Sequence, residues 1–301
     1  MALVGKAVRP ACHRAYTLAE LLVALFVIAL LVFVLLPALV PCRNGSSRQI
    51  KCGTQVRNII QAMTIFAQGN RDSYPLPSIL DANNAAVSAA DPREKDTTNN
   101  ILSILVFNSS ISPELLCSPA ETNSSIKVFA DYQAASPKAA VRPADALWDP
   151  SLRCDFTTGD GHVSCATLMP SGDCTPGVKS RGRLAMWGNT FNATEAVVAN
   201  RGPLVAGLDR NGEPIHNRNS NTMAIHGGRT TWEGNVGYND NHVNFETCMN
   251  PGEITYRSAD GKRKVGTFYY DEPDDAAAVN AYLGIWVRAG SLPQQFKGIH
   301  D

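Results

Sequence analysis

The strongest feature of the hydrophobic pattern is an apolar stretch near the amino terminus, from Tyr16 to Val40. Its central part, Leu21–Leu36, consists of sixteen consecutive apolar residues, and the one charged residue in the stretch is Glu20. A helix needs about 20 predominantly apolar residues to cross the hydrocarbon core of a membrane. The pattern therefore predicts a long apolar helix over residues 16–40 that spans a membrane.

A second, amphipathic pattern follows between Arg48 and Gly69, where apolar residues recur mostly at three- and four-residue spacing. This spacing places them on one face of a helix, and glycine favours the end of a helix. We predict an amphipathic helix over residues 41–70 that continues the first one. Residues 78–100 lack strong periodicity and are predicted to form a surface loop. The apolar run 101–107 is predicted to be a helix or a buried strand.

The remainder of the chain favours short strands and long loops. Residues 234–245, GNVGYNDNHVNF, predict a hairpin, because Asn and Asp tolerate the positive φ of a tight turn. Residues 131–185 are rich in proline and glycine and predict irregular structure, with a second hairpin turn at 159–163. In the tail, a strand is predicted over 266–270 and a short helix over 276–285. The fold class is therefore α+β: a long amino-terminal hydrophobic helix, then a head domain with an antiparallel β-sheet and long irregular loops.

Composition adds few constraints. Lys and Arg number 27, as do Asp and Glu, so the net charge is zero, and the basic residues are not interleaved with aromatic ones. Nothing here indicates a nucleic-acid partner. Residues 1–15 are basic and free of acidic residues. They are compatible with a secretory signal peptide, a lipoprotein signal or a plain membrane anchor. However, the apolar run is longer than a signal peptide needs, and Pro41 stands before Cys42 where a lipoprotein signal has a small residue.

The junction HRA-YTLAELL, with its basic leader, small residue, aromatic residue and a glutamate shortly after, resembles the processing signal of type IV prepilins. In that family an aspartyl peptidase cuts just before the aromatic residue and methylates the new amino terminus. The resemblance implies cleavage between Ala15 and Tyr16, with Ala15 standing where the family has glycine.

The resemblance also implies an assembly role for two residues of the apolar stretch. An ionisable group within an apolar segment is a functional candidate by default. In prepilin-like proteins the equivalent of Glu20 is neutralised by the amine freed at Tyr16 of a neighbouring subunit; the alternative is that Glu20 only reaches toward water. Pro37 lies where pilin-like helices often bend, and proline is tolerated in such helices as a kink.

Two further segments resemble planctomycete-type pseudopilin-like proteins. One runs from Cys52 to Tyr74-Pro75, and the other is Cys117-Ser118-Pro119. The resemblance implies that Cys117 packs near Cys52, with a disulfide between them as one outcome. The carboxy-terminal half resembles the domain named for a His and an Asp-Gly pair, which accompanies prepilin-type signals. Its turn residues would be His226, Asp240, Asn241 and His242, with Asn241 in place of the glycine.

The remaining candidate chemistry is sparse. No cysteine pair has C-x-x-C spacing, which argues against a zinc ribbon or a thioredoxin-type motif. Cys154, Cys165 and Cys174 lie in a segment poor in core-forming residues, where a disulfide would stabilise; the alternative is that all cysteines stay reduced. His162, His226, His242 and Asp240 could be recruited for a metal-dependent enzyme, but no recognised ligand spacing exists. An acidic run is a weak candidate for calcium, with a solvated loop as the commoner explanation: Asp271, Glu272, Asp274 and Asp275.

Together these observations predict a non-enzymatic pseudopilin or minor pilin-like subunit without a required cofactor. The predicted organisation is a leader over 1–15, a transmembrane assembly helix over 16–40, its amphipathic continuation over 41–70 and an exported head domain over 71–301. The protein would cross the inner membrane once, with its amino terminus in the cytoplasm. Its partners would be prepilin peptidase, other pilin-like subunits and a secreted substrate. The alternative is a membrane-anchored extracytoplasmic binding domain that does not assemble.

Overall fold

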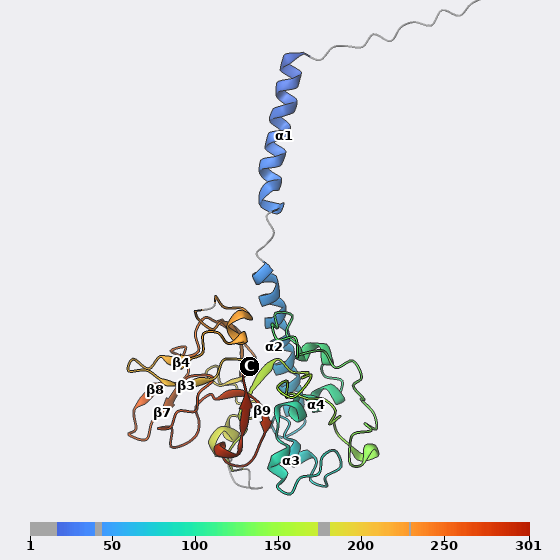
Figure 1. Ribbon diagram of the computed structural model, residues 1–301, viewed down its shortest axis with the longest axis vertical. Helices are drawn as coiled ribbons and strands as arrows, with labels where there is room; N and C mark the ends of the chain where they lie inside the picture. Colours follow the sequence, from blue (N-terminus) through green and yellow to red (C-terminus); the bar gives the residue numbers. More distant parts are fainter. Residues whose placement is uncertain (1–16, 40–43, 174–180, 229) are drawn as a thin grey trace, which may run out of the picture. The chain divides into compact units, whose positions relative to one another are not determined.

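The computed structural model describes residues 17–39, 44–173, 181–228 and 230–301, and within the first helix the side chains as far as Val32. By its contacts the chain divides into two compact units, residues 1–44 and 45–301. The first contains helix α1 (Leu18–Leu39), and the second, which we call the head, contains almost all of helix α2 (Asn44–Gln68) and every later element (Figure 1).

The predicted fold class needs correction in its first part. One long apolar helix that continues to residue 70 was expected, whereas α1 ends at Leu39 and α2 begins as a separate helix at Asn44. Proline has no backbone N–H to donate, and Pro37 and Pro41 remove two such donors on either side of the end of α1.

The predicted membrane-spanning segment is also corrected. Within the residues that the structure describes, no helix combines the length and the apolar character needed to cross a membrane. Crossing takes about 20 predominantly apolar residues, and the described side chains at this end of the chain cover residues 17–32. The assignment as a single-pass protein of the inner membrane is therefore not retained.

The head is built on a six-stranded antiparallel sheet with the strand order β10-β9-β1-β2-β5-β6. Its strands, in chain order, are β1 (Cys165–Leu168), β2 (Ala196–Asn200), β5 (Gly234–Tyr238), β6 (Val243–Glu246), β9 (Leu283–Arg288) and β10 (Lys297–Ile299). Two small hairpins stand beside it: β3 (Val205–Leu208) with β4 (Pro214–His216), and β7 (Thr255–Arg257) with β8 (Arg263–Val265). The antiparallel sheet of the predicted head is thus confirmed.

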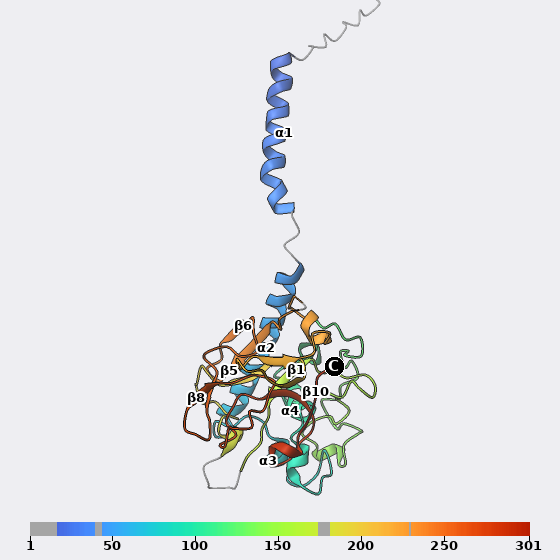
Figure 2. The same cartoon turned by 60° about the vertical axis from the view of Figure 1, so that its left-hand side comes forward.

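Helices α2 and α4 (Thr98–Phe107) pack on one face of this sheet (Figure 2). The Thr98 hydroxyl of α4 lies 3.1 Å from the Thr167 hydroxyl of β1. Thr167 is in register with Val198 of β2, and Val198 with Gly237 of β5, so the three share a face. A Cβ at Gly237 would lie 3.1 Å from Val56 of α2. The same face therefore receives both helices.

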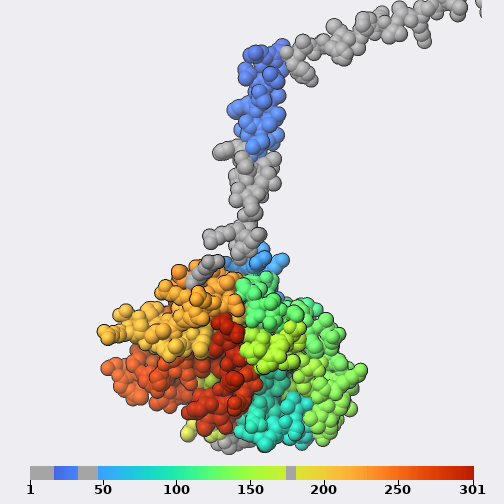
Figure 3. Space-filling model, in the orientation of Figure 1, coloured from blue at the N-terminus to red at the C-terminus, as the bar shows by residue number. Residues whose placement is uncertain are grey.

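Aromatic side chains from the loops pack at the end of β2. Trp232 packs edge-on against Tyr269, with ring centroids 5.1 Å apart. The Tyr269 hydroxyl donates to the carbonyl oxygen of Asn200 at 2.6 Å, and the Trp232 indole donates to that of Arg201 at 3.1 Å. These polar contacts tie the loops to the end of β2. The carboxy-terminal segment, red in the space-filling view, reaches the surface between the orange and green segments (Figure 3).

Short helical turns complete the head. They are α3 (Pro77–Leu80), η1 (Pro92–Lys95), η2 (Pro113–Leu116), η3 (Pro143–Asp145), η4 (Gly182–Ala185), η5 (Asn221–Ala224) and η6 (Pro293–Gln295). The prediction of a surface loop over 78–100 is wrong, because buried ion pairs anchor this segment. Lys95 Nζ lies 3.2 Å from Asp81 Oδ2, and Arg93 Nη1 lies 3.0 Å from Asp96 Oδ2. Charges are buried in proteins when such partners accompany them.

Other local predictions had mixed outcomes. The hairpin over 234–245 is confirmed as β5 and β6. The amphipathic helix predicted over 41–70 is present as α2, but it begins at Asn44, ends at Gln68 and is separate from α1. The helix expected over 276–285 is wrong, since residues 283–288 form β9, and the strand expected over 266–270 is a turn region. The second hairpin expected at 159–163 is an isolated bridge between Gly161 and Ile126.

Candidate functional site

The amino-terminal end of α1 is organised by a reciprocal pair of hydrogen bonds between Thr17 and Glu20. The Thr17 backbone N–H donates to Glu20 Oε2 at 2.8 Å, and the Glu20 N–H donates to the Thr17 hydroxyl oxygen at 3.2 Å. The Thr17 hydroxyl also donates to the same carboxylate at 3.0 Å. This is a capping box, which satisfies backbone donors that the first turn of a helix leaves free.

The hydrogen bonds also favour the charged form of the Glu20 carboxyl. The backbone N–H of Thr17, followed by its hydroxyl, lowers the pKa of the Glu20 carboxyl. The carboxylate is fully exposed and therefore charged at neutral pH. It lies in the first turn, where the helix dipole favours a negative charge. Glu20 is thus a fixed anion at the start of an otherwise apolar helix.

The described part of α1 beyond Glu20 is apolar on all sides. The large apolar side chains in this part, from Leu21 to Val32, are between 46% and 69% exposed. Exposed apolar surface of this extent marks a site of interaction. Glu20 and this surface together form the candidate site, which we call the α1 surface.

The structure places one of the three other residues of the predicted assembly site. Ala15 and Tyr16, the predicted cleavage and methylation position, lie outside the described residues. Pro37 lies within α1, two residues before its end at Leu39, so the helix continues past the proline for less than one turn.

The residues of the His and Asp-Gly resemblance lie on the β5–β6 hairpin and beside it. Asp240 and Asn241 form the turn, with Asn241 at φ 69°, and the His242 ring stacks on Tyr238 at 4.4 Å. His242 Nδ1 contacts the Asp240 carboxylate. Burial acts to raise the pKa of Asp240, but the hydrogen bonds from His242 outweigh it and lower the pKa. This arrangement stabilises the turn.

His226 lies at the other end of that hairpin. Its ring contacts Phe245, which is paired with Asn235, with centroids 5.8 Å apart. Burial lowers the pKa of His226 to about 4, so the ring is neutral at neutral pH. His162 is placed elsewhere and stacks on Phe129 at 4.6 Å. The structure therefore does not gather the three histidines into one centre, and in its described part no group of His, Cys, Asp and Glu is arranged to hold a metal ion.

The prediction of disulfides among the cysteines needs correction. Within the described residues Cys52, Cys117, Cys154 and Cys165 are free thiols, and Cys174 lies outside these residues. The expected proximity is nevertheless present, because the hydroxyl of Ser118, next to Cys117, donates to Cys52 Sγ at 3.2 Å. Burial raises the pKa of Cys117 and Cys154 to about 12, so these thiols are poor nucleophiles at neutral pH.

The four carboxylates proposed as calcium ligands interact with hydrogen-bond donors and a cation of the protein itself. Asp271 pairs with Arg183, and Glu272 accepts from the Thr267 N–H at 2.6 Å. Asp274 accepts from the Tyr256 hydroxyl at 2.7 Å, and Asp275 accepts from the N–H groups of Val279 and Asn280, both at 2.7 Å. Glu272 and Asp275 thus hold local turns together, while Asp271 and Asp274 make contacts that are distant in the sequence.

Comparison of the chain with protein-family models, with curated proteins and with solved structures finds no match. The function is therefore argued from the site alone. Sequence reasoning identified Glu20 but overlooked Thr17, although the T-x-x-E spacing of a capping box was visible in residues 17–20. What the α1 surface offers chemically is apolar contact area with one fixed negative charge at its amino-terminal end.

Proposed function

We propose that this chain is a non-enzymatic, pilin-like structural subunit that is processed between Ala15 and Tyr16 and assembles with like subunits through α1. The observation that carries the proposal is the exposed apolar surface of α1, with Glu20 as its single described charge. Water-exposed apolar area of this size is unfavourable. Packing α1 against the equivalent helices of other subunits would remove it from water.

The position of Glu20 supports the same proposal. Covering α1 by other subunits would desolvate the Glu20 carboxylate, and a desolvated charge is costly without a partner. The amine that cleavage would free at Tyr16 of a neighbouring subunit is a cation of suitable size. The capping box matters here, because it fixes the carboxylate close to the start of α1.

The first test is the mature amino terminus. The full chain is produced together with a prepilin peptidase, and its amino terminus is determined by mass spectrometry. We expect a start at Tyr16 carrying an N-methyl group. A chain that still begins at Met1 while a reference prepilin in the same cells is cleaved would contradict the proposal.

The second test separates the charge of Glu20 from its capping role. Glu20→Gln keeps a capping box, since glutamine serves in this position as glutamate does, but it removes the charge. We expect Glu20→Gln and Glu20→Ala each to reduce the amount of the chain in the sheared-filament fraction by about tenfold or more, as expected when about 1.4 kcal/mol per contact is lost.

The matched control is Thr17→Ala, which removes the capping hydroxyl and leaves the charge. It should assemble nearly as well as the unchanged chain. If Glu20→Gln assembles normally while Thr17→Ala does not, Glu20 acts only as a cap and the charge pairing is wrong. If the unchanged, processed chain never enters the filament fraction, the proposed function itself is wrong.

A further inference from the structure

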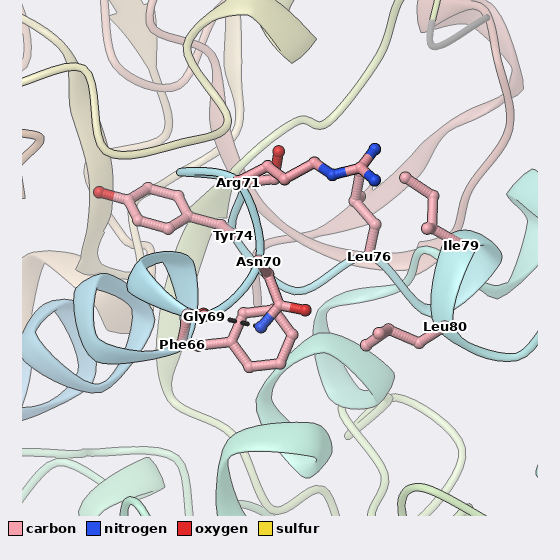
Figure 4. Close-up of a pocket in the computed structure, with 9 residues that line it drawn as sticks. Phe66, Gly69, Asn70, Arg71, Tyr74, Leu76, Ile79 and Leu80 are labelled. Atoms are coloured by element: carbon pink, nitrogen blue, oxygen red, sulfur yellow. Dashed lines mark hydrogen bonds between the residues drawn. The ribbon is translucent and has the colours of Figure 1, made fainter. Parts of the chain in front are cut away.

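A pocket of about 350 Å³ lies in the head where α2 ends and the chain turns toward α3. It is lined by the last residues of α2, by the turn after it and by α3 (Figure 4). Its apolar side is formed by Phe66, Leu76, Ile79 and Leu80, and its polar side includes Asn70 and Arg71. Binding sites for small molecules commonly have such a volume and combine apolar walls with a few polar groups.

The turn that carries Arg71 has a demanding backbone conformation. Arg71 and Asp72 have φ values of 56° and 59°, a left-handed region that is uncommon for residues other than glycine. The conformation is held by capping bonds at the end of α2. The Asp72 N–H donates to the carbonyl oxygen of Ala67 at 3.0 Å, and the Asn70 side chain donates to that of Phe66 at 2.7 Å. Such conformations cluster at functional sites.

The guanidinium of Arg71 is available for a ligand. It makes no hydrogen bond or ion pair with another residue in the described part of the chain. Figure 4 shows Arg71 extending toward the side of the pocket where Leu76 and Ile79 lie. The hydroxyl of Tyr74 points the opposite way, where it donates to Asn239 at 2.8 Å. Arg71 is therefore the cation of this pocket.

The apolar side is partly open to solvent. In the wall of the pocket, Leu76 is buried, whereas Ile79 is 57% exposed. Phe66 is half-buried and packs against the core. A ligand that covered this surface would bury apolar area while its charged end met Arg71.

We propose that this pocket binds a small carboxylate with an apolar body, of about the size of an N-acylated amino acid. The planar guanidinium of arginine matches a carboxylate in shape and charge and forms two parallel hydrogen bonds with it. The apolar body would lie on Phe66, Leu76 and Ile79. The proposal concerns the head and does not depend on assembly through α1.

The probe for the test is N-acetyl-4-fluoro-L-phenylalanine, followed by ¹⁹F NMR with the full chain. The comparison ligand is its carboxamide, which has the same body without the charge. We expect saturable binding of the carboxylate and binding at least tenfold weaker for the amide. Arg71→Gln should weaken carboxylate binding by a similar factor, because a charge-assisted hydrogen bond is lost. Arg57→Gln, an exposed position on α2 that lines a different groove, should have no effect.

A second pair of variants protects the test against a folding defect in Arg71→Gln. Ile79→Asp and Ile79→Lys remove the same apolar side chain from an exposed position but add opposite charges. The carboxylate should bind more tightly to the Lys variant than to the Asp variant. The proposal is overturned if the carboxylate does not bind saturably, if the amide binds equally well, or if the two Ile79 variants bind the carboxylate alike.

Discussion

Glu272 is an acidic residue in an environment very different from that of an exposed carboxylate. Its side chain is 2% exposed and lies among the turns that follow β8. It accepts from the Thr267 N–H at 2.6 Å and contacts the Asn280 amide, which also meets the buried Arg183. Burial raises the pKa of Glu272 to about 7. The carboxyl is therefore largely protonated in weakly acidic solution in the folded protein.

This pKa predicts a pH dependence of stability. Because the folded pKa of about 7 exceeds the value of 4.5 for an exposed glutamate, the folded state binds the proton more tightly than the unfolded state. The contribution of Glu272 protonation to the free energy of unfolding is full below pH 4.5 and is lost as the pH rises through 7. We expect Glu272→Gln, which stays neutral, to gain stability relative to the unchanged protein over this window, by on the order of 3 kcal/mol.

Urea unfolding at pH 4.5 and pH 8 measures this difference. The exposed Glu253→Gln is the control and should shift by little at either pH. A difference between the unchanged protein and Glu272→Gln that stays constant with pH would show that Glu272 does not titrate in this window. The sequence predicted these acidic residues as a solvated loop or calcium ligands, because nothing local in 271–275 indicates that Glu272 is buried beside Asn280 and the distant Arg183.

At the scale of elements, the β5–β6 hairpin could be predicted because its signal is local. The turn residues, including Asn241 with its positive φ, stand between two short runs that pair with each other. Strand β1 gave no such signal. Its four residues, CATL, lie in a proline- and glycine-rich segment, and its partners β2 and β9 are distant in the sequence. Strand propensity depends strongly on packing context, so a central strand of this kind is decided by its neighbours.

The packing of α2 on β5 gives a test at the same scale. Gly237 lies under α2, and an added Cβ would meet Val56 at 3.1 Å and Ile60 at 3.4 Å. A larger side chain has to push the helix away or adopt a strained rotamer. We expect Gly237→Val to lower the free energy of unfolding by about 1–3 kcal/mol, measured by urea denaturation.

Two comparisons check that the cause is the contact with α2. Adding Val56→Ala to Gly237→Val should recover part of the loss, because it removes the methyl groups that the new side chain meets. Gly228→Ala, where an added Cβ meets nothing within 4 Å, should change stability little. Equal losses for Gly237→Val and Gly228→Ala would count against close packing at this crossing.

At the scale of the whole molecule, the two units differ in what stabilises them. The main core of the head is built from residues between Val56 and Ile299, with α2 supplying one wall. The described residues of α1 contribute no side chain to that core and expose their apolar surface. The sequence could predict the second helix from its three- and four-residue periodicity, whereas the first was predicted from an uninterrupted apolar run and was expected to be continuous with the second. It could not predict that the second helix belongs to the head, since this depends on the strands that α2 covers.

This division predicts how truncations behave. A chain of residues 45–301 retains every member of the main core, so we expect cooperative thermal unfolding with a melting temperature within about 3 °C of the full chain, as followed by circular dichroism. A chain of residues 70–301 lacks Val56, Ile59, Ile60 and Met63. Burying each such side chain contributes about 1.5–3 kcal/mol, and together they match a typical net stability of about 5–15 kcal/mol. The shorter chain should therefore fail to fold, and a cooperative transition in it would show that α2 is not part of the core.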